Sequence, residues 1–406
     1  MKKSILMVAF FFAAITAYGQ DNLKLPGVVP PSPTVASLMS LEAVPIAYYT
    51  GQPNISIPIF SKGLNKDLTL NIGLQYTTTG VQIDSRSGWT GTGWALQTGG
   101  VISRTVRGIP DEDKKQGHNR TGVLNNPDFW NFDNLSYLEK DEFNWKAKGS
   151  SANRYDTELD LYQFNLLGVS GRFVVVNDNG ILKAKLISKS QNIKVSITYN
   201  STDFKITAFL VTDALGYKYT FDIIEEMTST PVYGNVAQGN GVGIIDVSGI
   251  QGIVTNISAW HLRKIETSND INLATFAYST HGHTYETANS RTENTLLASF
   301  NSDVLNNGYN SGVLKPQSTT AKYAVSAQTK KPSIITFKDG TSVHFSTTSS
   351  HPETYGAVLS SIAIKDNASQ TNKTYNFTYE TTNRLWLNKV SEVGGSLILN
   401  HTLDYN

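Results

Sequence analysis

Apolar and polar residues alternate along much of this chain, and this period of two is the feature that most restricts its fold. In the stretch LTLNIGLQY, which begins at Leu68, apolar side chains occupy every second position. Because successive side chains of a strand point to opposite faces, such a stretch buries one face of a sheet. Other strand-like stretches begin at Asn54, Arg172, Ile193, Tyr217, Thr374 and Leu397. No stretch combines a long apolar period of 3.6 residues with caps, so the sequence predicts an all-β fold with few helices.

Several strand-like stretches occur in pairs separated by short turns. WHLRKIETSNDINLATFAY begins at Trp260, LSSIAIKDNASQTNKTYNFTY at Leu359 and LWLNKVSEVGGSLILNHTLDY at Leu385. Each predicts a strand, a turn and a second strand. Since one hairpin cannot bury its apolar face alone, copies must share a core. We therefore expect antiparallel hairpins in a large curled sheet, a sandwich or a shell.

The amino-acid composition indicates how the fold is stabilised and in which compartment it works. The chain has no cysteine, so burial without disulfides must supply its stability. The net charge of +1 gives no electrostatic case for nucleic acid as a partner. Charged residues make up 17% of the chain, against roughly 25% in typical soluble domains. Asn, Ser, Thr and Gly take their place, which favours an extracellular β-rich surface.

The first 53 residues resemble an export signal and a spacer. Residues 1–19 combine two lysines, an apolar run and small residues before the expected cleavage point, which predicts a signal peptide. This run is too short for a membrane anchor, and no later run is long enough to span a membrane. Residues 20–53 contain PGVVPPSP and predict an extended, proline-rich leader. We expect the mature protein to be secreted or held at the cell surface.

Two β regions are predicted after this leader, an N-terminal β domain over 54–225 and a second region of irregular hairpins over 226–406. Within the second region we expect long loops at about 229–258 and 280–331. The first is glycine-rich with one strand, and the second is a surface excursion or a partly helical insert. The sequence stops on an alternating strand, which would leave an exposed sheet edge. We therefore expect the protein to continue beyond residue 406.

The stretch SGWTGTGWALQTGGVISR, from Ser87, raises the question of a nucleotide site. A dinucleotide fingerprint needs a third glycine where Leu96 stands, and it needs a helix where strand-like residues follow. Glycines also allow positive φ or close backbone approach, and tryptophans fill cores. Gly99 and Gly100 predict a two-residue hairpin turn. We interpret the stretch as a structural motif made of Gly88, Trp89, Gly91, Gly93, Trp94, Leu96, Ile102 and Arg104.

The order of several segments resembles a known family. PSPTVASL, VPIAYYTGQPNISIPIF, LNIGLQYTTTGVQID, the Gly–Trp stretch and YDTELDLYQFNLLGVSGRFVV resemble the N-terminal region of secreted Rhs/YD-repeat proteins, which is similar to the SpvB-type domain of Tc-toxin B subunits. The resemblance covers residues 26–180 and is most specific at G-x-G-W-x-L…I-x-R. It implies hairpin strips that form a β shell around a C-terminal toxin or effector. Clean YD repeats are absent, with only remnants such as TLDYN.

This resemblance implies a non-enzymatic shell or cap segment of an exported surface or toxin-delivery protein. Its partner would be a downstream YD-repeat shell or a C-terminal effector domain. A cell-surface protein or a glycan is a further candidate partner. The alternative function is a secreted carbohydrate-binding or glycan-acting β protein, since the chain has 19 Tyr and 17 Phe. We predict no catalytic residue.

Three acidic residues, Asp156, Glu158 and Asp160, alternate in RYDTELDLYQF. On one strand face they would lie about 6.5–7 Å apart. That spacing fits a solvated or Arg-paired face, a calcium site, or an inverting glycosidase pair. We favour the structural interpretation and keep calcium as the only candidate cofactor. For Arg104 we expect a carboxylate partner or strand carbonyls.

Other polar motifs have ordinary interpretations. His281 and His283 form an H-x-H pair, which we interpret as part of a surface turn; His261, His344 and His351 are the residues that could approach them as metal ligands. The run DEDKK from Asp111 predicts a solvated loop. GVSGRF from Gly168 lacks the spacing of a nucleophile elbow and predicts a hairpin turn.

Overall fold

The structure is a computed structural model. It describes residues 46–47, 52–53, 55–76, 86–114, 120–147, 154–167, 169–187, 192–238, 241–245, 254–286, 290–294, 317–348 and 351–405. The predicted signal peptide, 1–19, lies outside these residues. Of the predicted leader, 20–53, the structure describes β1 (Ile46–Ala47) and β2 (Gln52–Pro53), which pair with each other in antiparallel fashion. The chain divides into two compact units, Met1–Ile55 and Ser56–Asn406.

Antiparallel strands dominate the second unit, which confirms the all-β prediction. They are β3 (Ser56–Asn65), β4 (Leu68–Tyr76), β5 (Trp94–Gln97), β6 (Gly100–Thr105), β7 (Arg120–Thr121), β8 (Arg154–Tyr155), β9 (Leu161–Leu166), β10 (Val169–Asp178), β11 (Ile181–Leu186), β12 (Lys194–Tyr199), β13 (Ile206–Thr212), β14 (Lys218–Gln238), β15 (Gly241–Ile245), β16 (Val254–Glu266), β17 (Asn272–Glu286), β18 (Ser290–Asn294), β19 (Gln317–Phe337), β20 (Ser342–Thr348), β21 (Val358–Lys365), β22 (Thr371–Thr381), β23 (Leu385–Gly394) and β24 (Leu397–Thr402). In the described residues, no helix is long and apolar enough to cross a membrane.

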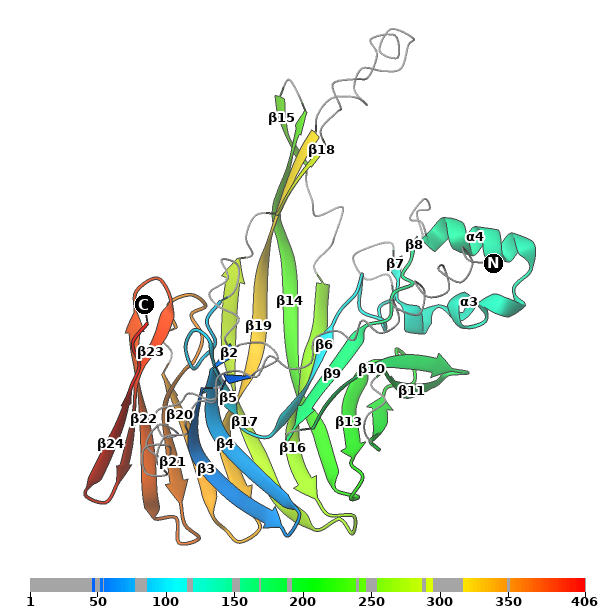
Figure 1. Ribbon diagram of the computed structural model, residues 1–406. Coiled ribbons are helices and arrows are strands. Elements are labelled where there is room, and N and C mark those ends of the chain that lie inside the picture. The colour runs from blue at the N-terminus through cyan, green and yellow to red at the C-terminus, as the bar shows by residue number, and fades with distance from the viewer. Residues whose placement is uncertain are drawn as a thin grey trace, which may run out of the picture. The chain divides into compact units, whose positions relative to one another are not determined.

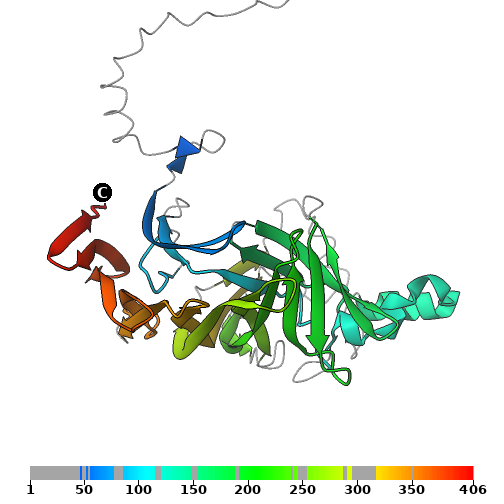
Figure 2. The same ribbon diagram turned by 90° about the horizontal axis from the view of Figure 1, so that it is seen from below.

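Four long strands form the centre of the unit. β14 pairs with β16, β16 with β17, β17 with β19, and β19 returns to β14, so the four strands make a closed ring. From β16 the pairing continues through β6 and β9 to β10 and β11. From β19 it continues through consecutive hairpins to β24, drawn in orange to red in Figure 2. The ring therefore joins two wings of sheet.

The predicted strand–turn–strand units are confirmed. β16 and β17, β21 and β22, and β23 and β24 are antiparallel hairpins. The GVSGRF motif also lies in a hairpin, between β9 and β10, although its turn precedes Val169 and Ser170 lies within the second strand. Alternation identified strands that keep one face buried; in β4 the side chains of Leu68, Leu70, Ile72 and Leu74 are all buried. β24 is an exception, because Leu397, Ile398 and Leu399 on it are exposed.

The described parts of the two predicted long loops are strand, and this corrects the sequence interpretation there. β14 runs on to Gln238 and pairs with β19 from Glu226 onwards, while β15 and β18 pair with the far ends of this ribbon, as Figure 1 shows. β14 also crosses the predicted boundary between 225 and 226 without a break. The ribbon is joined by ladder hydrogen bonds between β14 and β19, and its largely polar sequence gave no long periodic signal.

A short helical excursion interrupts the strands after β7. It contains η1 (Val123–Asn125), α3 (Pro127–Trp130), η2 (Phe132–Asn134) and α4 (Tyr137–Ala147). Before α4, the Ser136 backbone N–H donates to Glu139 Oε2 at 2.8 Å, a capping box that the sequence displays as S-x-x-E. This signal was available from the sequence, although α4 has no apolar stripe: only Phe143 is buried.

A smaller sheet of β3, β4 and β5 accompanies the large one. The chain passes from this sheet to the large one at Gly99, because β5 pairs with β4 whereas β6 pairs with β9 and β16. The predicted hairpin at Gly99-Gly100 is therefore wrong. Gly99 has a φ of 142°, and a Cβ atom there would lie 2.9 Å from the Phe276 ring. A glycine is needed for this crossing between sheets.

Aromatic rings fill the core beneath β9, β10, β13 and β16. The Tyr162, Phe173, Phe209 and Trp260 side chains are fully buried. Ring centroids lie 5.2 Å apart for Tyr162 and Phe173 and 4.9 Å apart for Phe209 and Trp260. Since each such ring buries roughly 150–250 Å², this cluster is a principal source of stability for the wing.

Candidate functional site

Trp94 occupies the position that the sequence predicted, inside the core. Its side chain is 5% exposed, and its ring centroid lies 5.2 Å from that of Tyr76. The indole Nε1–H donates to the Tyr405 hydroxyl at 2.9 Å, and that hydroxyl donates to the Leu387 carbonyl at 2.7 Å. The polar edge of the ring is thus satisfied by the last part of the described chain.

Two of the predicted glycines are required by the backbone. Gly91 and Gly93 have φ angles of 97° and 77°. A Cβ atom at Gly91 would lie 3.0 Å from the Leu387 backbone nitrogen, and one at Gly93 would lie 2.6 Å from the Tyr76 ring. Gly88 is not at positive φ; it pairs with Gly91 in an isolated bridge. The motif therefore holds the chain close to its neighbours, as predicted.

The turn around these glycines is hydrogen-bonded to distant strands. The Thr92 backbone N–H and Oγ1–H both donate to the Leu385 carbonyl, at 2.8 and 2.9 Å. The Leu359 N–H donates to the Trp89 carbonyl at 2.9 Å. Strand β5 follows, where a nucleotide site would need a helix. Trp89 differs from Trp94, since it is only half-buried and lies with its ring 5.6 Å from the Lys331 ammonium.

Arg104 has carboxylate partners, which settles the choice left open by the sequence. The residue is 8% exposed. Its Nε–H donates to Asp160 Oδ2 at 2.8 Å, and its Nη1–H donates to Glu112 Oε1 at 2.9 Å. The guanidinium also lies over the Tyr162 ring, 5.7 Å from its centroid. Ile102, two residues earlier on β6, is fully buried. Both residues support the structural interpretation of the motif.

Asp111 and Asp160 connect two loops beneath this arginine. Asp160 Oδ1 accepts from the Arg107 N–H at 2.8 Å, and Oδ2 accepts from the Asp111 N–H at 3.1 Å. The Asp160 N–H in turn donates to Asp111 Oδ2 at 3.0 Å. Asp111 is 0% exposed, so the prediction of a solvated DEDKK loop is wrong at its first residue. The run gave no local signal, because its partners lie far away in the sequence.

The charges in this cluster determine where its proton resides. Burial, reinforced by the Asp160 charge, raises the pKa of Asp111 to about 8. Burial also raises the pKa of Asp160, against the attraction of Arg104. For Glu112 the effect of burial is outweighed by Arg104, which lowers its pKa. The raised pKa favours a protonated Asp111 at neutral pH, beside the ion pairs of Arg104 with Glu112 and Asp160.

The three acidic residues proposed for calcium do not share a strand face. Residues 156–160 lie between β8 and β9, and Glu158 is exposed whereas Asp156 and Asp160 are buried. Asp156 accepts from the backbone N–H groups of Ile109 and Glu158, at 2.8 and 3.1 Å. Within the described ranges, no group of three His, Asp or Glu residues is arranged to hold a metal ion. The buried pair is occupied by backbone and arginine contacts instead.

The histidines are also placed differently from expectation. His281 and His283 lie within strand β17 and not in a turn. Burial lowers the pKa of both. His281 Nε2 is 2.8 Å from Ser279 Oγ, and His344 makes a similar contact with Ser342 on β20. His351 Nε2 lies 3.0 Å from the Ser87 carbonyl oxygen and so braces the Gly–Trp turn.

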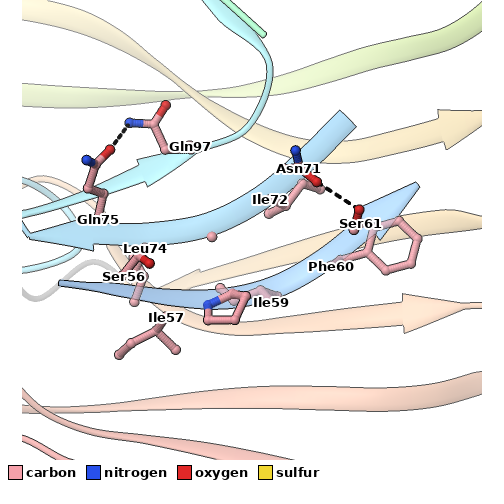
Figure 3. A pocket seen from close by; sticks show the side chains of 12 residues that line it. Ser56, Ile57, Ile59, Phe60, Ser61, Asn71, Ile72, Leu74, Gln75 and Gln97 are labelled. Atoms are coloured by element: carbon pink, nitrogen blue, oxygen red, sulfur yellow. Dashed lines mark hydrogen bonds between the residues drawn. The ribbon is translucent and has the colours of Figure 1, made fainter. Parts of the chain in front are cut away.

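Figure 3 shows a shallow hollow of about 360 Å³ on the ladder between β3 and β4. Gly73 lies in its lining, on β4. Ser61 donates to Asn71 at 2.8 Å, and Gln97 donates to Gln75 at 3.3 Å, so its polar groups satisfy one another. No titratable residue lines it. The lining of this hollow therefore provides no group for acid–base catalysis.

Comparisons with known proteins give a limited result. No protein-family model matches the sequence, and no curated protein matches it. Among solved structures, the N-terminal domain of the effector protein SpvB from Salmonella typhimurium strain LT2 is similar to this chain. The match has 7% sequence identity and a TM-score of 0.39, and it covers 84% of this chain and 98% of that chain.

Proposed function

We propose that this chain is a non-enzymatic structural segment, a β shell or cap, of an exported Rhs/YD-repeat-like surface or toxin-delivery protein. The observation that carries the proposal is the way in which the Gly–Trp motif is used. Its backbone and side chains are engaged with Tyr76, Leu385, Leu387 and Tyr405. The buried charges around Arg104 are likewise paired with one another. These contacts support a role in closing a wall of sheet.

Trp94→Ala tests whether the motif locks the fold. We expect a loss of about 3–5 kcal/mol in the free energy of unfolding, because a buried ring is removed. Trp145→Ala is the matched control, since that ring is 55% exposed, and we expect a change within roughly 0.5 kcal/mol. Urea unfolding followed by circular dichroism measures both. Equal losses of unfolding free energy in the two variants would show that Trp94 does not lock the fold.

The shell role itself is tested on the complete gene product. If the reading frame continues past residue 406, a shell should protect the downstream segment from added protease, and Trp94→Ala should remove that protection. Trp145→Ala should leave it intact. A downstream segment that is cut equally fast in all three proteins, or a reading frame that ends at this residue, contradicts the proposal.

A further inference from the structure

A cavity of about 210 Å³ lies beside the segment that crosses between the two sheets. Trp89, Thr98 and Gly99 line it from the Gly–Trp motif. Asn165, Tyr278 and Lys331 line it from β9, β17 and β19. The cavity thus collects an aromatic ring, neutral hydrogen-bonding groups and a cation from four parts of the fold. Its volume is below the range of about 300–1,000 Å³ that drug-sized ligands occupy, so a single small ring is the appropriate size.

Lys331 is the unusual member of this lining. Its side chain is half-buried, and burial lowers its pKa. Within the part of the chain that the structure describes, its Nζ forms no hydrogen bond or ion pair; its contact is the Trp89 ring, 5.6 Å away. A partly desolvated ammonium without an anion is costly. An incoming carboxylate would relieve that cost.

Glu225 acts on Lys331 through its charge but is already engaged elsewhere. One of its carboxylate oxygens, Oε2, accepts from the Lys330 backbone N–H at 2.9 Å and lies 3.3 Å from His261 Nε2. The Lys330 ammonium donates to Thr280 Oγ1 at 2.7 Å. The other charged groups that line the cavity therefore have partners, and Lys331 does not. A ligand carboxylate has one evident cation to meet.

We propose that this cavity binds a small sugar acid of the hexuronate class, with its carboxylate on Lys331 and its ring against Trp89. An aromatic face packs against the C–H face of a sugar ring, and a buried charge-assisted hydrogen bond supplies orientation. Thr98 and Asn165 have side chains without hydrogen bonds to described residues, and they are the groups that meet the hydroxyls. An extended acidic peptide would need a groove or a free strand edge.

The test uses the full chain titrated with D-glucuronate by isothermal calorimetry and by ligand-observed NMR. We expect binding at roughly millimolar concentration, an estimate for one charge-assisted contact and one stacked ring. D-Glucose presents the same ring without the carboxylate and should bind at least tenfold more weakly. A short glutamate-containing peptide should not bind. No binding of glucuronate, equal binding of glucose, or tighter binding of the peptide overturns the proposal.

Two lysine variants locate the site. Lys331→Met should reduce glucuronate affinity at least tenfold, while Lys331→Arg, which keeps the charge, should stay within a few fold. Lys373→Met is the matched control, because Lys373 also lies over an aromatic ring, 6.0 Å from the Tyr375 centroid, but is paired with Glu392. A loss in the control as large as that of Lys331→Met contradicts the assignment. Failure here leaves the shell proposal standing, since the two rest on different residues.

Discussion

Arg104 and Lys331 are two cations withdrawn from water, and the protein treats them in opposite ways. Arg104 is met by two carboxylates, Glu112 and Asp160, with Asp111 beneath them. Among the described residues, Lys331 lies over the Trp89 ring and forms no ion pair. A charge that is paired with fixed carboxylates cannot also bind a ligand. A charge that lies beside a cavity without such a partner can bind one. This contrast separates the part of the molecule that holds the wall together from the part that can receive something.

The largest effect should come from removing the paired cation. Arg104→Met leaves Asp160 and Glu112 facing each other in a buried site, which should cost about 3–5 kcal/mol of unfolding free energy. Urea unfolding at pH 7 measures it. Arg263→Met is the control, because Arg263 pairs with Asp222 at a position where its side chain is 41% exposed, and that change should cost less than about 1 kcal/mol. Similar losses in the two variants would mean that burial does not distinguish these ion pairs.

An effect of comparable size, spread over several pH units, should appear in the pH dependence of stability. The groups that face Asp111 are Asp160, Glu112 and Arg104. Because its pKa is about 8 in the folded chain, against 3.8 for an ordinary aspartate, the folded state holds this proton more tightly than the unfolded state. Stability from this group is therefore complete below pH 4 and is lost as pH rises towards 8, by at most about 1.4 kcal/mol per pH unit.

Asp111→Asn isolates that contribution, since the amide resembles the protonated acid. Unfolding free energies measured from pH 5 to pH 8 should converge at the acidic end and favour the variant at the alkaline end. Opposing shifts at Glu112 cancel in the comparison with the parent protein. Parallel curves across this range would show that Asp111 is ionised in the folded state.

The smallest effect should come from the unpaired cation. In the ligand-free protein, Lys331→Met removes a charge that has no anionic partner, so stability should change by less than about 1 kcal/mol or increase. Thermal unfolding without sugar measures this. A loss of stability above about 2 kcal/mol would show that Lys331, like Arg104, stabilises the fold, and would contradict the contrast between the two cations.

The sequence predicted those parts of the fold in which each strand buries one face. β4 matches the predicted stretch from Leu68 to Tyr76, and the hairpins of the second wing were recognised from their alternation. It did not predict the ribbon of β14 and β19, where backbone hydrogen bonds join two strands whose paired residues are largely polar. The polar composition there was therefore indistinguishable from that of a loop.

The candidate site divides in the same way. Trp94, Gly91 and Gly93 were predicted because bulky rings and glycines in one turn have few structural uses. Arg104 was predicted without its partner, since Asp160 lies 56 positions further along the chain. Nothing local distinguished Asp111 from a solvated acid or Lys331 from a surface lysine. The burial of Asp111 and Lys331 by residues far away in the sequence determines their pKa shifts, and a single sequence does not show which residues these are.

The hydrogen bond between Trp94 and Tyr405 has a consequence for the order of events during folding. Its partners are 311 positions apart, so the indole stays unsatisfied until nearly all of the described chain has been made. Contacts of such long range form late and slowly. The polar edge of Trp94 is therefore satisfied only after strands far apart in the sequence have come together.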